Sequence, residues 1–385
     1  MGTKRLTNIP GFSIDRVAAE AGDDPEVLRL ENLDTDLPPP APAIEATRAA
    51  IGRDEDNSYL PFTGRAELRE AVAQHLNKQT GHNYDPNSNV VITAGGTEGM
   101  FDALLATTDP GHEVILTDPT YAGMINRVRL AGAVPKLVPF RVQDNEWRLD
   151  VDKLRAAISN RTRAMFIMNP SMPSSALLNR NEWDVVAKLC QDHSLWLIYN
   201  AAMERILFKN HEYIHPATLP GMLERTITVG SVSKEYRMIG WRVGWVVAPP
   251  EITNDIALVH IYNVVTPPGV TQMGAVAALQ SPYEDFVACV AEWEKRHDTV
   301  VEQLEEYPLI PAAGGWSLLM DVGAIGYDSF TASRLLLEKG KTAATPMRDW
   351  GEQNSDQFVR LVFSNEPVKR LAELRDRVMR ALPPS

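Results

Sequence analysis

The sequence is poor in cysteine and contains no long hydrophobic run. Cys190 and Cys289 are the only two cysteines among 385 residues, too few for a disulfide framework, so we expect a reducing, cytoplasmic compartment. No apolar run approaches the roughly 20 residues that a transmembrane helix needs. Residues 1–5 are not followed by the apolar core of a signal peptide. We therefore expect no membrane as a partner.

Positive charge is also scarce. The formal net charge is −12 at pH 7, whereas a nucleic-acid surface needs clustered lysine and arginine, so we expect no nucleic acid as a partner. The eight histidines show no spacing typical of metal ligands, and we expect no metal site. Hydrophobic residues are present in ordinary amount, 44% of the chain, which fits a globular protein with a substantial core.

Apolar runs alternate with amphipathic stretches in the central part of the chain. Continuous apolar runs with helices between them indicate an α/β fold with a mostly parallel sheet. The expected strands are residues 90–93, 114–117, 164–168, 195–199, 226–229 and 244–247. The expected helices are residues 98–107, 121–130, 151–158 and 182–193. The last two strands are close enough in sequence for one of them to run antiparallel.

The alternation of apolar runs with amphipathic stretches ends after about Pro282. A long charged helix is expected over residues 284–306, followed by short strands over residues 316–322 and 358–363. We predict that this part forms a smaller α+β domain.

One lysine stands in an unusual setting. A predicted strand leads into Gly230-Ser231-Val232-Ser233-Lys234, and Gly240-Trp241-Arg242-Val243-Gly244 follows. A lysine that forms a Schiff base needs space for a bulky aldehyde and a weakened hold on its own proton. Small neighbours provide the space, and Arg242 offers forked donors for a phosphate. The combination indicates pyridoxal 5′-phosphate (PLP), whereas Ser-x-Ser-Lys alone is typical of a solvated turn.

With Gly240, Arg242 and Gly244 in place, the chain resembles the aspartate aminotransferase family of PLP enzymes (fold type I, aminotransferase class I/II) from about residue 30 to the C-terminus. The resemblance implies a fold-type I PLP-dependent transferase, with a large, mostly parallel sheet domain plus a smaller α+β domain. The implied boundaries are residues 46–282 for the PLP-binding domain, and residues 1–45 with 283–385 for the small domain. The resemblance also implies a homodimer with shared active sites.

The resemblance assigns cofactor contacts to particular residues. Gly95-Gly96-Thr97 follows a strand and opens a helix, where backbone N–H groups favour a phosphate. Implied phosphate contacts are Gly96, Thr97, Ser231, Ser233 and Arg242, and Gly95 belongs to the same cofactor-binding turn. Tyr121 is expected to stack on the pyridine ring, with packing at a helix start as the alternative. Tyr59 is expected to reach the phosphate of the neighbouring subunit, and Thr266 to act similarly.

Two further residues are expected at the substrate. Arg360, in Phe358-Val359-Arg360-Leu361-Val362, stands where the family binds the α-carboxylate, a planar group suited to arginine; the alternative is a surface arginine on a strand. Leu33 stands where the family has a glycine, so it should narrow the side-chain pocket together with Met347.

Three positions depart from the family around one edge of the cofactor ring. Asn200 replaces the aspartate that pairs with the pyridine nitrogen, and an amide cannot neutralise a pyridinium. Met203 and Met172 replace a tyrosine and an asparagine that contact the phenolic oxygen. Asn169, Tyr199 or Glu204 could restore part of these contacts.

The functional hypothesis is therefore a PLP-dependent aminotransferase that acts on an amino acid or a related amine, with a keto acid as acceptor and the Schiff base on Lys234. The altered ring contacts leave two alternatives open. One is a PLP-dependent lyase, eliminase or cyclase acting on an amino acid in specialised metabolism. The other is a PLP-binding protein with low turnover.

Overall fold

The computed structural model describes residues 6–383 except residues 8, 12, 210 and 354. Its larger sheet has eight strands. In sheet order these are β2 (Val90–Thr93), β9 (Gly244–Val247), β8 (Thr226–Ser231), β7 (Trp196–Asn200), β6 (Thr162–Met168), β3 (Glu113–Asp118), β4 (Val134–Gln143) and β5 (Glu146–Leu149). The pairs from β8 across to β4 are parallel, while β2–β9, β9–β8 and β4–β5 are antiparallel.

All six strands expected from the apolar runs are present, with ends that differ by at most two residues. Their residues are almost all buried, as expected for a sheet covered on both faces. The sequence pattern did not indicate β4 or β5. Pro135 and Pro139 interrupt the apolar run of β4, and both of its ends are exposed; such residues are tolerated near the edge of a sheet.

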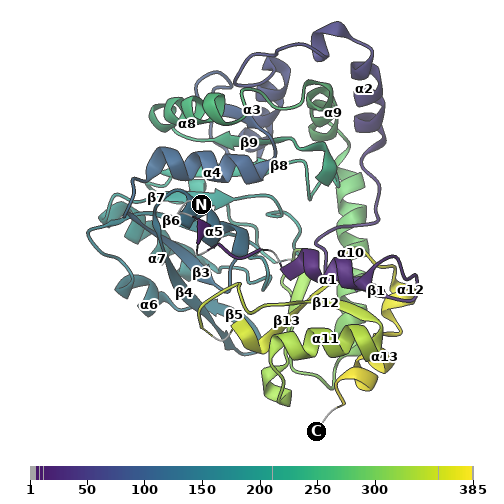
Figure 1. Cartoon of the computed structure of the whole chain (residues 1–385). Coiled ribbons are helices and arrows are strands. Elements are labelled where there is room, and N and C mark those ends of the chain that lie inside the picture. Colours follow the sequence, from purple (N-terminus) through teal and green to yellow (C-terminus); the bar gives the residue numbers. More distant parts are fainter. Residues whose placement is uncertain (1–5, 8, 12, 210, 354, 384–385) are drawn as a thin grey trace.

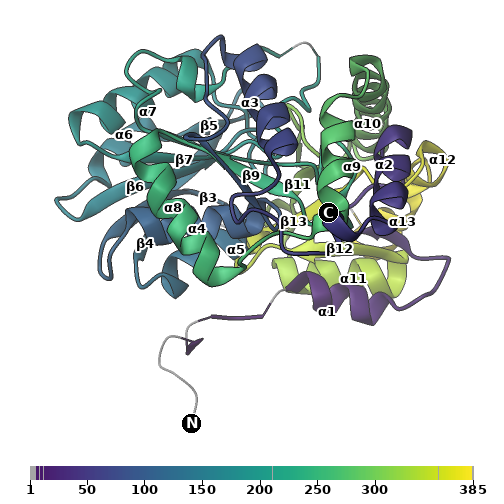
Figure 2. The same cartoon turned by 90° about the horizontal axis from the view of Figure 1, so that it is seen from above.

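Thirteen α-helices surround the two sheets in the described part of the chain. Those in the first two thirds are α1 (Ser13–Ala21), α2 (Ala41–Ile51), α3 (Ala66–Thr80), α4 (Gly96–Thr107), α5 (Ala122–Leu130), α6 (Val151–Ala156), α7 (Arg180–Asp192) and α8 (Pro250–Asn263). The remainder are α9 (Gly269–Leu279), α10 (Tyr283–Gln303), α11 (Ser329–Gly340), α12 (Val368–Leu371) and α13 (Leu374–Ala381). Figure 2 shows α6 and α7 on one side of the large sheet and α4, α5 and α8 on the other.

Helix starts follow local chemistry where the sequence supplies a cap. At α7, the Asn179 side chain accepts the Glu182 N–H, and the Glu182 carboxylate accepts the Asn179 N–H, which forms a capping box. This cap places the start of α7 two residues earlier than the apolar periodicity predicted.

A second, five-stranded sheet has the order β1 (Leu28–Leu30), β12 (Thr342–Pro346), β13 (Phe358–Val362), β11 (Ser317–Asp321) and β10 (Leu309–Ile310). The N-terminal strand β1 pairs in parallel with β12, so the two ends of the chain build one sheet. Figure 1 shows α1 and β1 beside β12 and α11, and the long helix α10 running from the upper part of the molecule to the lower. The N-terminal segment therefore joins the C-terminal part, as the resemblance implied.

None of the described helices combines the length and apolar composition that a bilayer crossing requires. The four bulkiest fully buried side chains are tryptophans, Trp183, Trp293, Trp316 and Trp350. Trp316 directly precedes strand β11 of the smaller sheet, and Trp350 lies in the loop before strand β13. Both come close to the charged residues described below.

Parallel strands bring their carboxyl ends to one edge of a sheet, and ligands of open α/β sheets bind there. In this chain β6, β7 and β8 are parallel, and β2 runs in the same direction because two antiparallel pairings separate it from β8. The residues that follow these four strands therefore meet at one edge, opposite the smaller sheet.

Candidate active site

A cavity of about 290 Å3 lies at this edge. It brings together eleven of the predicted site residues: Leu33, Gly96, Thr97, Tyr121, Met172, Asn200, Ser231, Ser233, Lys234, Arg242 and Arg360. Larger hollows of about 370 and 650 Å3 lie elsewhere, and none of the predicted site residues lines them. Convergence of one lysine, two arginines and several hydroxyl groups distinguishes the smaller cavity.

Lys234 follows β8 and extends into this cavity. Its Nζ donates a hydrogen bond to the Leu33 carbonyl oxygen at 2.6 Å and lies 4.9 Å from the centre of the Trp316 ring. Burial lowers the pKa of Lys234 to about 7, opposed by Asp34 and assisted by Arg360 and Arg242. Near neutral pH a large share of this amine is thus unprotonated, as a nucleophile or a general base requires.

The turn before α4 packs directly against the Arg242 side chain. Gly95 has φ +80°, and a Cβ at this position would collide with the Arg242 guanidinium, so glycine is required for both backbone and contact. Arg242 itself has φ +56°, and its Nη1 donates to the Ile239 carbonyl oxygen at 2.6 Å. The guanidinium is held beside the N-terminus of a twelve-residue helix, an arrangement that favours an anion.

Hydroxyl groups complete this end of the cavity. Thr97, Ser231 and Ser233 all line it beside Arg242. Gly95 does not line the cavity, because it packs beneath the arginine. The cationic fork, the helix N-terminus and the hydroxyls match the donor set that a phosphate needs, so these residues fit the phosphate group of PLP.

Asn200, at the end of β7, has a defined orientation. Its side-chain oxygen accepts the Ala202 N–H at 3.0 Å, and its Nδ2 faces the sulfur atoms of Met100 and Met168 at 3.4 and 3.5 Å. Thioether sulfur is only a weak acceptor. The amide therefore presents a donor that has no strong acceptor among the described residues, which fits an unprotonated pyridine nitrogen.

The other residues expected at the cofactor ring differ in whether they line the cavity. Met172 lines the cavity with its sulfur 3.8 Å from Arg360 Nη1, whereas Met203 is buried outside the lining. Asn169, Tyr199 and Glu204, considered as replacements for the missing contacts, do not line the cavity either. Burial, with the charge of Glu235, raises the pKa of Glu204 to about 8, and Tyr199 donates to the Asn169 carbonyl oxygen at 3.4 Å.

Arg360, on β13, is fully buried and is not a surface residue. Its Nη2 donates to the Glu31 carbonyl oxygen at 2.6 Å, and its guanidinium lies 4.8 Å from the centre of the Trp350 ring. Burial lowers its pKa to about 10, opposed by Glu31 and Tyr121. Nε has no hydrogen-bond partner among the described residues. A buried arginine with an unsatisfied donor beside a cavity is suited to an incoming carboxylate.

Seven lining residues were not predicted: Ile14, Asn32, Met100, Met168, Ala202, Ile239 and Trp350. Met168 and Ala202 follow strand ends, so the rule for parallel sheets could have indicated them. Ile14 comes from α1 and Trp350 from a loop of the smaller sheet. No local pattern brings these two residues to the carboxyl edge of the large sheet.

Two residues expected at the subunit interface lie outside the cavity of this chain. Tyr59 is 83% exposed, and the Thr266 side chain donates to the neighbouring Pro267 carbonyl oxygen at 3.4 Å. Neither residue lines the cavity. Met347 is fully buried and does not line the cavity, in contrast to Leu33.

Comparison with known proteins agrees with this geometry. The sequence profile of the family described as aminotransferase class I and II matches residues 27–378. Arginine–pyruvate transaminase of Pseudomonas aeruginosa is 31% identical over 361 residues, covering 92% of this chain and 90% of that protein. Aspartate aminotransferase of Pyrococcus abyssi is 30% identical over 328 residues, 84% of each chain.

The chain belongs to the class I and II aminotransferases. The solved structure of N-succinyldiaminopimelate aminotransferase from Mycobacterium tuberculosis superposes with a TM-score of 0.93 at 28% identity, covering 98% of this chain and 99% of that one. Aspartate aminotransferase from Thermus thermophilus gives a TM-score of 0.91 at 26% identity, covering 99% and 100%. The aminotransferase thus has the fold-type I architecture, uses PLP as its cofactor and acts on amino acids.

Proposed function

We propose that the cavity is the transamination site and that Lys234 is its catalytic residue. When bound, PLP supplies an aldehyde that reacts with amino groups and a ring that withdraws electrons from the substrate Cα. Arg242, Thr97 and Ser231 hold the phosphate, with Gly96 and Ser233 beside them, and Tyr121 fixes the ring plane. The observation that carries the proposal is that a buried lysine shares one cavity with Arg242 and Arg360; burial lowers the pKa of Lys234 to about 7.

The chain's own residues divide the work of the reaction. Arg360 binds the substrate carboxylate and orients the Cα–H bond. Lys234 Nζ, of which a large share is unprotonated near neutral pH, removes the Cα proton as general base and would deliver it as general acid to C4′ of the cofactor. Asn200 donates to the ring nitrogen and leaves it without a formal charge. Leu33 and Trp350 cover the reacting atoms and exclude water.

A labelling experiment tests the role of Lys234. Protein incubated with PLP is treated with borohydride, which makes the bond between amine and aldehyde permanent, and its peptides are mapped by mass. We expect the adduct on the peptide that contains Lys234, and no adduct there in Lys234→Ala. Lys188→Ala serves as control, because Lys188 is 74% exposed on α7 and pairs only with Asp192 among the described residues. An adduct elsewhere, or normal turnover in Lys234→Ala, would refute the assignment.

We also propose that the amino donor has an apolar side chain. The three charged side chains that line the cavity, Lys234, Arg242 and Arg360, are all cationic, and the remaining wall includes Ile14, Leu33 and Trp350. A donor such as arginine, named for the Pseudomonas relative, would bring a further cation into this wall without an acidic partner. Such a pocket favours donors like leucine, methionine or phenylalanine.

A donor panel measures this preference. With pyruvate or 2-oxoglutarate as acceptor, kcat/KM for apolar donors should exceed that for arginine and aspartate by at least tenfold, roughly the effect of one uncompensated polar group. Leu33→Gly should enlarge the pocket and favour bulkier donors. Release of ammonia without formation of an amino product from the acceptor would instead indicate elimination. A preference for arginine would contradict the apolar assignment.

We propose a homodimer in which Tyr59 reaches the phosphate site of the second subunit. Exposed apolar side chains accompany the 58–64 segment and α8: Tyr59, Phe62, Leu258, Tyr262 and Val265. Phe62 and α8 are in direct contact through His260, which supports one continuous surface suited to a partner. Sedimentation analysis should give a dimer, and Tyr59→Phe should weaken PLP binding; a monomer at micromolar concentration would refute the proposal.

For the domains, we propose residues 46–282 as the PLP-binding unit and residues 1–45 with 283–385 as the small unit. Pairing of β1 with β12 and the start of α10 at Tyr283 support this division. Residues 41–45 belong to α2, which packs against α9, so the first boundary is better placed at residue 40. We also propose a cytoplasmic location, supported by two buried, free cysteines.

A further inference from the structure

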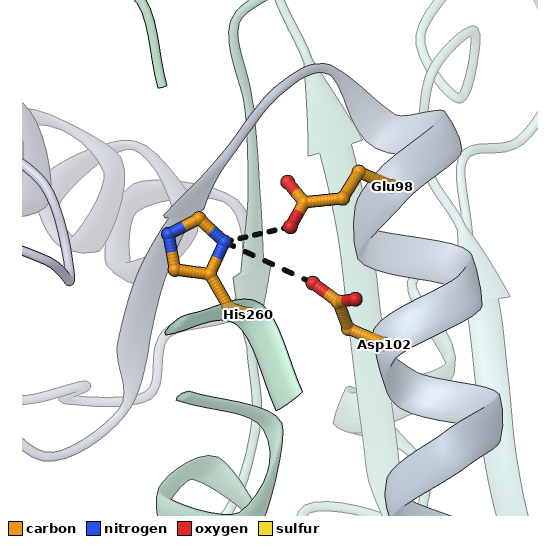
Figure 3. A group of neighbouring side chains, drawn as sticks. All are labelled: Glu98, Asp102 and His260. Carbon is orange, nitrogen blue, oxygen red and sulfur yellow. Dashed lines mark hydrogen bonds and ion pairs between the residues drawn. The ribbon is translucent and has the colours of Figure 1, made fainter. Parts of the chain in front are cut away.

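A buried group of three ionisable side chains lies behind the phosphate-binding turn. Glu98 and Asp102 are one turn apart on α4, and His260 projects toward both from α8 (Figure 3). Glu98 is 8% exposed, and the other two are fully buried. None of the three lines the active-site cavity, so direct contact with substrate does not explain the group.

Glu98 binds the turn itself. Its Oε2 accepts the N–H of Ala94, the residue before Gly95-Gly96-Thr97, at 2.6 Å, and its Oε1 lies 2.7 Å from His260 Nδ1. Burial acts to raise the pKa of Glu98, but hydrogen bonds from His260 and Asp102 outweigh it and lower the pKa overall. Burial, with Glu98 as hydrogen-bond partner, raises the pKa of Asp102 to about 9, so Asp102 is protonated at neutral pH.

His260 has acceptors on both sides. Nδ1 faces the Glu98 carboxylate, and Nε2 lies 2.9 Å from the Phe62 carbonyl oxygen. The ring therefore bridges the Glu98 carboxylate on α4 and the Phe62 carbonyl oxygen of the 58–64 segment, which are both hydrogen-bond acceptors. The group therefore connects α4 to the 58–64 segment through one buried histidine.

The histidine joins two segments that are far apart in the sequence. One is the turn at residues 94–97, and the other is the 58–64 segment, which contains both Phe62 and the exposed Tyr59. We propose that Glu98 and His260 are positioning residues that hold the phosphate turn and the Tyr59 segment in one arrangement, so that PLP binding and subunit pairing strengthen each other. This inference rests on the proposed dimer and on the proposed phosphate site.

The coupling follows from shared geometry. A phosphate fixes the turn and therefore Glu98. The contacts of His260 with Glu98 and with the Phe62 carbonyl oxygen then fix the 58–64 segment. Tyr59 in that segment is proposed to meet the phosphate of the second subunit. Linkage is reciprocal, so PLP should tighten the dimer by the same factor by which the dimer tightens PLP binding.

Two substitutions separate the halves of the connection. In His260→Asn the amide nitrogen occupies the position of Nδ1. This variant keeps the hydrogen bond to Glu98 and loses the hydrogen bond to the Phe62 carbonyl oxygen. In His260→Gln the amide nitrogen occupies the position of Nε2. This variant keeps the hydrogen bond to the Phe62 carbonyl oxygen and removes the hydrogen bond between residue 260 and Glu98. Glu98→Gln is a third variant, which weakens the hold on Ala94. Lys188→Ala, on the other side of the sheet, is the control.

Affinity for PLP and for pyridoxal, which lacks the phosphate, is measured on the cofactor-free protein by absorbance titration. We expect His260→Gln and Glu98→Gln to weaken PLP binding by about tenfold to a hundredfold and to change pyridoxal binding less than about threefold. His260→Asn should lose only the part of the PLP affinity that subunit pairing contributes. Equal losses for PLP and pyridoxal would mean general damage and would overturn the positioning role, as would wild-type affinities in both His260→Gln and Glu98→Gln.

The dimer dissociation constant is measured by sedimentation with and without PLP. The wild type should dimerise at least about tenfold more tightly with PLP, and both histidine variants should lose most of this factor. Unchanged coupling in both variants would overturn the inference while leaving the proposed function intact. A wild type that stays monomeric would overturn the coupling and the proposed dimer together, and lack of a PLP adduct at Lys234 would overturn the proposed function alone.

Discussion

Replacing Lys234 with methionine removes one ionisable group from the cavity and keeps the length of the side chain. In the unfolded chain the amine has its ordinary pKa of 10.5, whereas in the folded protein burial lowers the pKa to about 7. Between these pH values the unfolded state binds more protons than the folded state, so the free energy of unfolding rises with pH. The cofactor-free wild type should therefore gain stability relative to Lys234→Met from pH 7 to pH 9.

The size of the gain follows from the pKa difference. Each pH unit within the window is worth about 1.4 kcal/mol for a fully shifted group. The Lys234 side chain keeps some contact with water in the cavity, which reduces the effect. We expect the wild type to gain about 1–2 kcal/mol relative to the variant over these two pH units.

Other groups titrate in the same range with the opposite sign. Raised pKa values of about 8 for Glu204 and about 9 for Asp102 mean that the folded state holds their protons longer, so they lower stability as the pH rises. Both residues are present in the wild type and in Lys234→Met. The difference between the two proteins therefore isolates the lysine.

Urea unfolding at pH 7, 8 and 9 measures this difference. Lys188→Met, at an exposed position, should show no change in its stability gap to the wild type across the series. A constant gap for Lys234→Met, or a gap that changes in the other direction, would refute the argument that Lys234 is held with a lowered pKa. The rate of PLP uptake should also level off just above pH 7 rather than rise toward pH 10.

Three further changes test other parts of the site. Arg360→Lys loses the forked donors and should lower kcat/KM for the amino donor by about 10- to 100-fold, with PLP affinity unchanged in an absorbance titration; an unaltered kcat/KM would remove Arg360 from the carboxylate site. Asn200→Asp should shift the pH at which the absorbance of bound PLP titrates, because a carboxylate favours a protonated ring nitrogen; an unshifted titration would place the ring elsewhere. Gly95→Ala should weaken PLP binding and lower the free energy of unfolding by more than about 1 kcal/mol, since Cβ meets Arg242, while Gly81→Ala, with a similar φ of +72° but no neighbour within 4 Å, measures the backbone strain alone.

The sequence carried enough information for the central strands and for the residues that follow them. Buried parallel strands are nearly continuous apolar runs, and their carboxyl ends meet by geometry. The resemblance assigned Asn200 and Lys234 to one site, and both lie at or just after the carboxyl ends of the neighbouring parallel strands β7 and β8. Strand β4 could not, because its prolines and exposed ends break the pattern.

The other cavity residues and contacts depend on tertiary packing. Leu33 and Arg360 were expected from the resemblance, but Ile14 and Trp350 reach the cavity only because the smaller sheet folds against the large one. Likewise, the link between Glu98 and His260 joins positions 162 residues apart. Local patterns do not encode such contacts. Met203, expected at the cofactor from the resemblance, is buried and does not line the cavity.

The uncharged amide at Asn200 is consistent with the charge balance of the whole cavity. PLP and an amino-acid substrate bring a phosphate and a carboxylate, and the wall presents two arginines and a lysine. An additional carboxylate at position 200 would have to be compensated by a proton on the ring nitrogen, because its neighbours there are the sulfurs of Met100 and Met168. With asparagine the ring needs no such proton and withdraws electrons less strongly. Under the proposed function, removal of the Cα proton then depends more on the base. Lys234, whose pKa is lowered by burial to about 7, would supply that base near neutral pH.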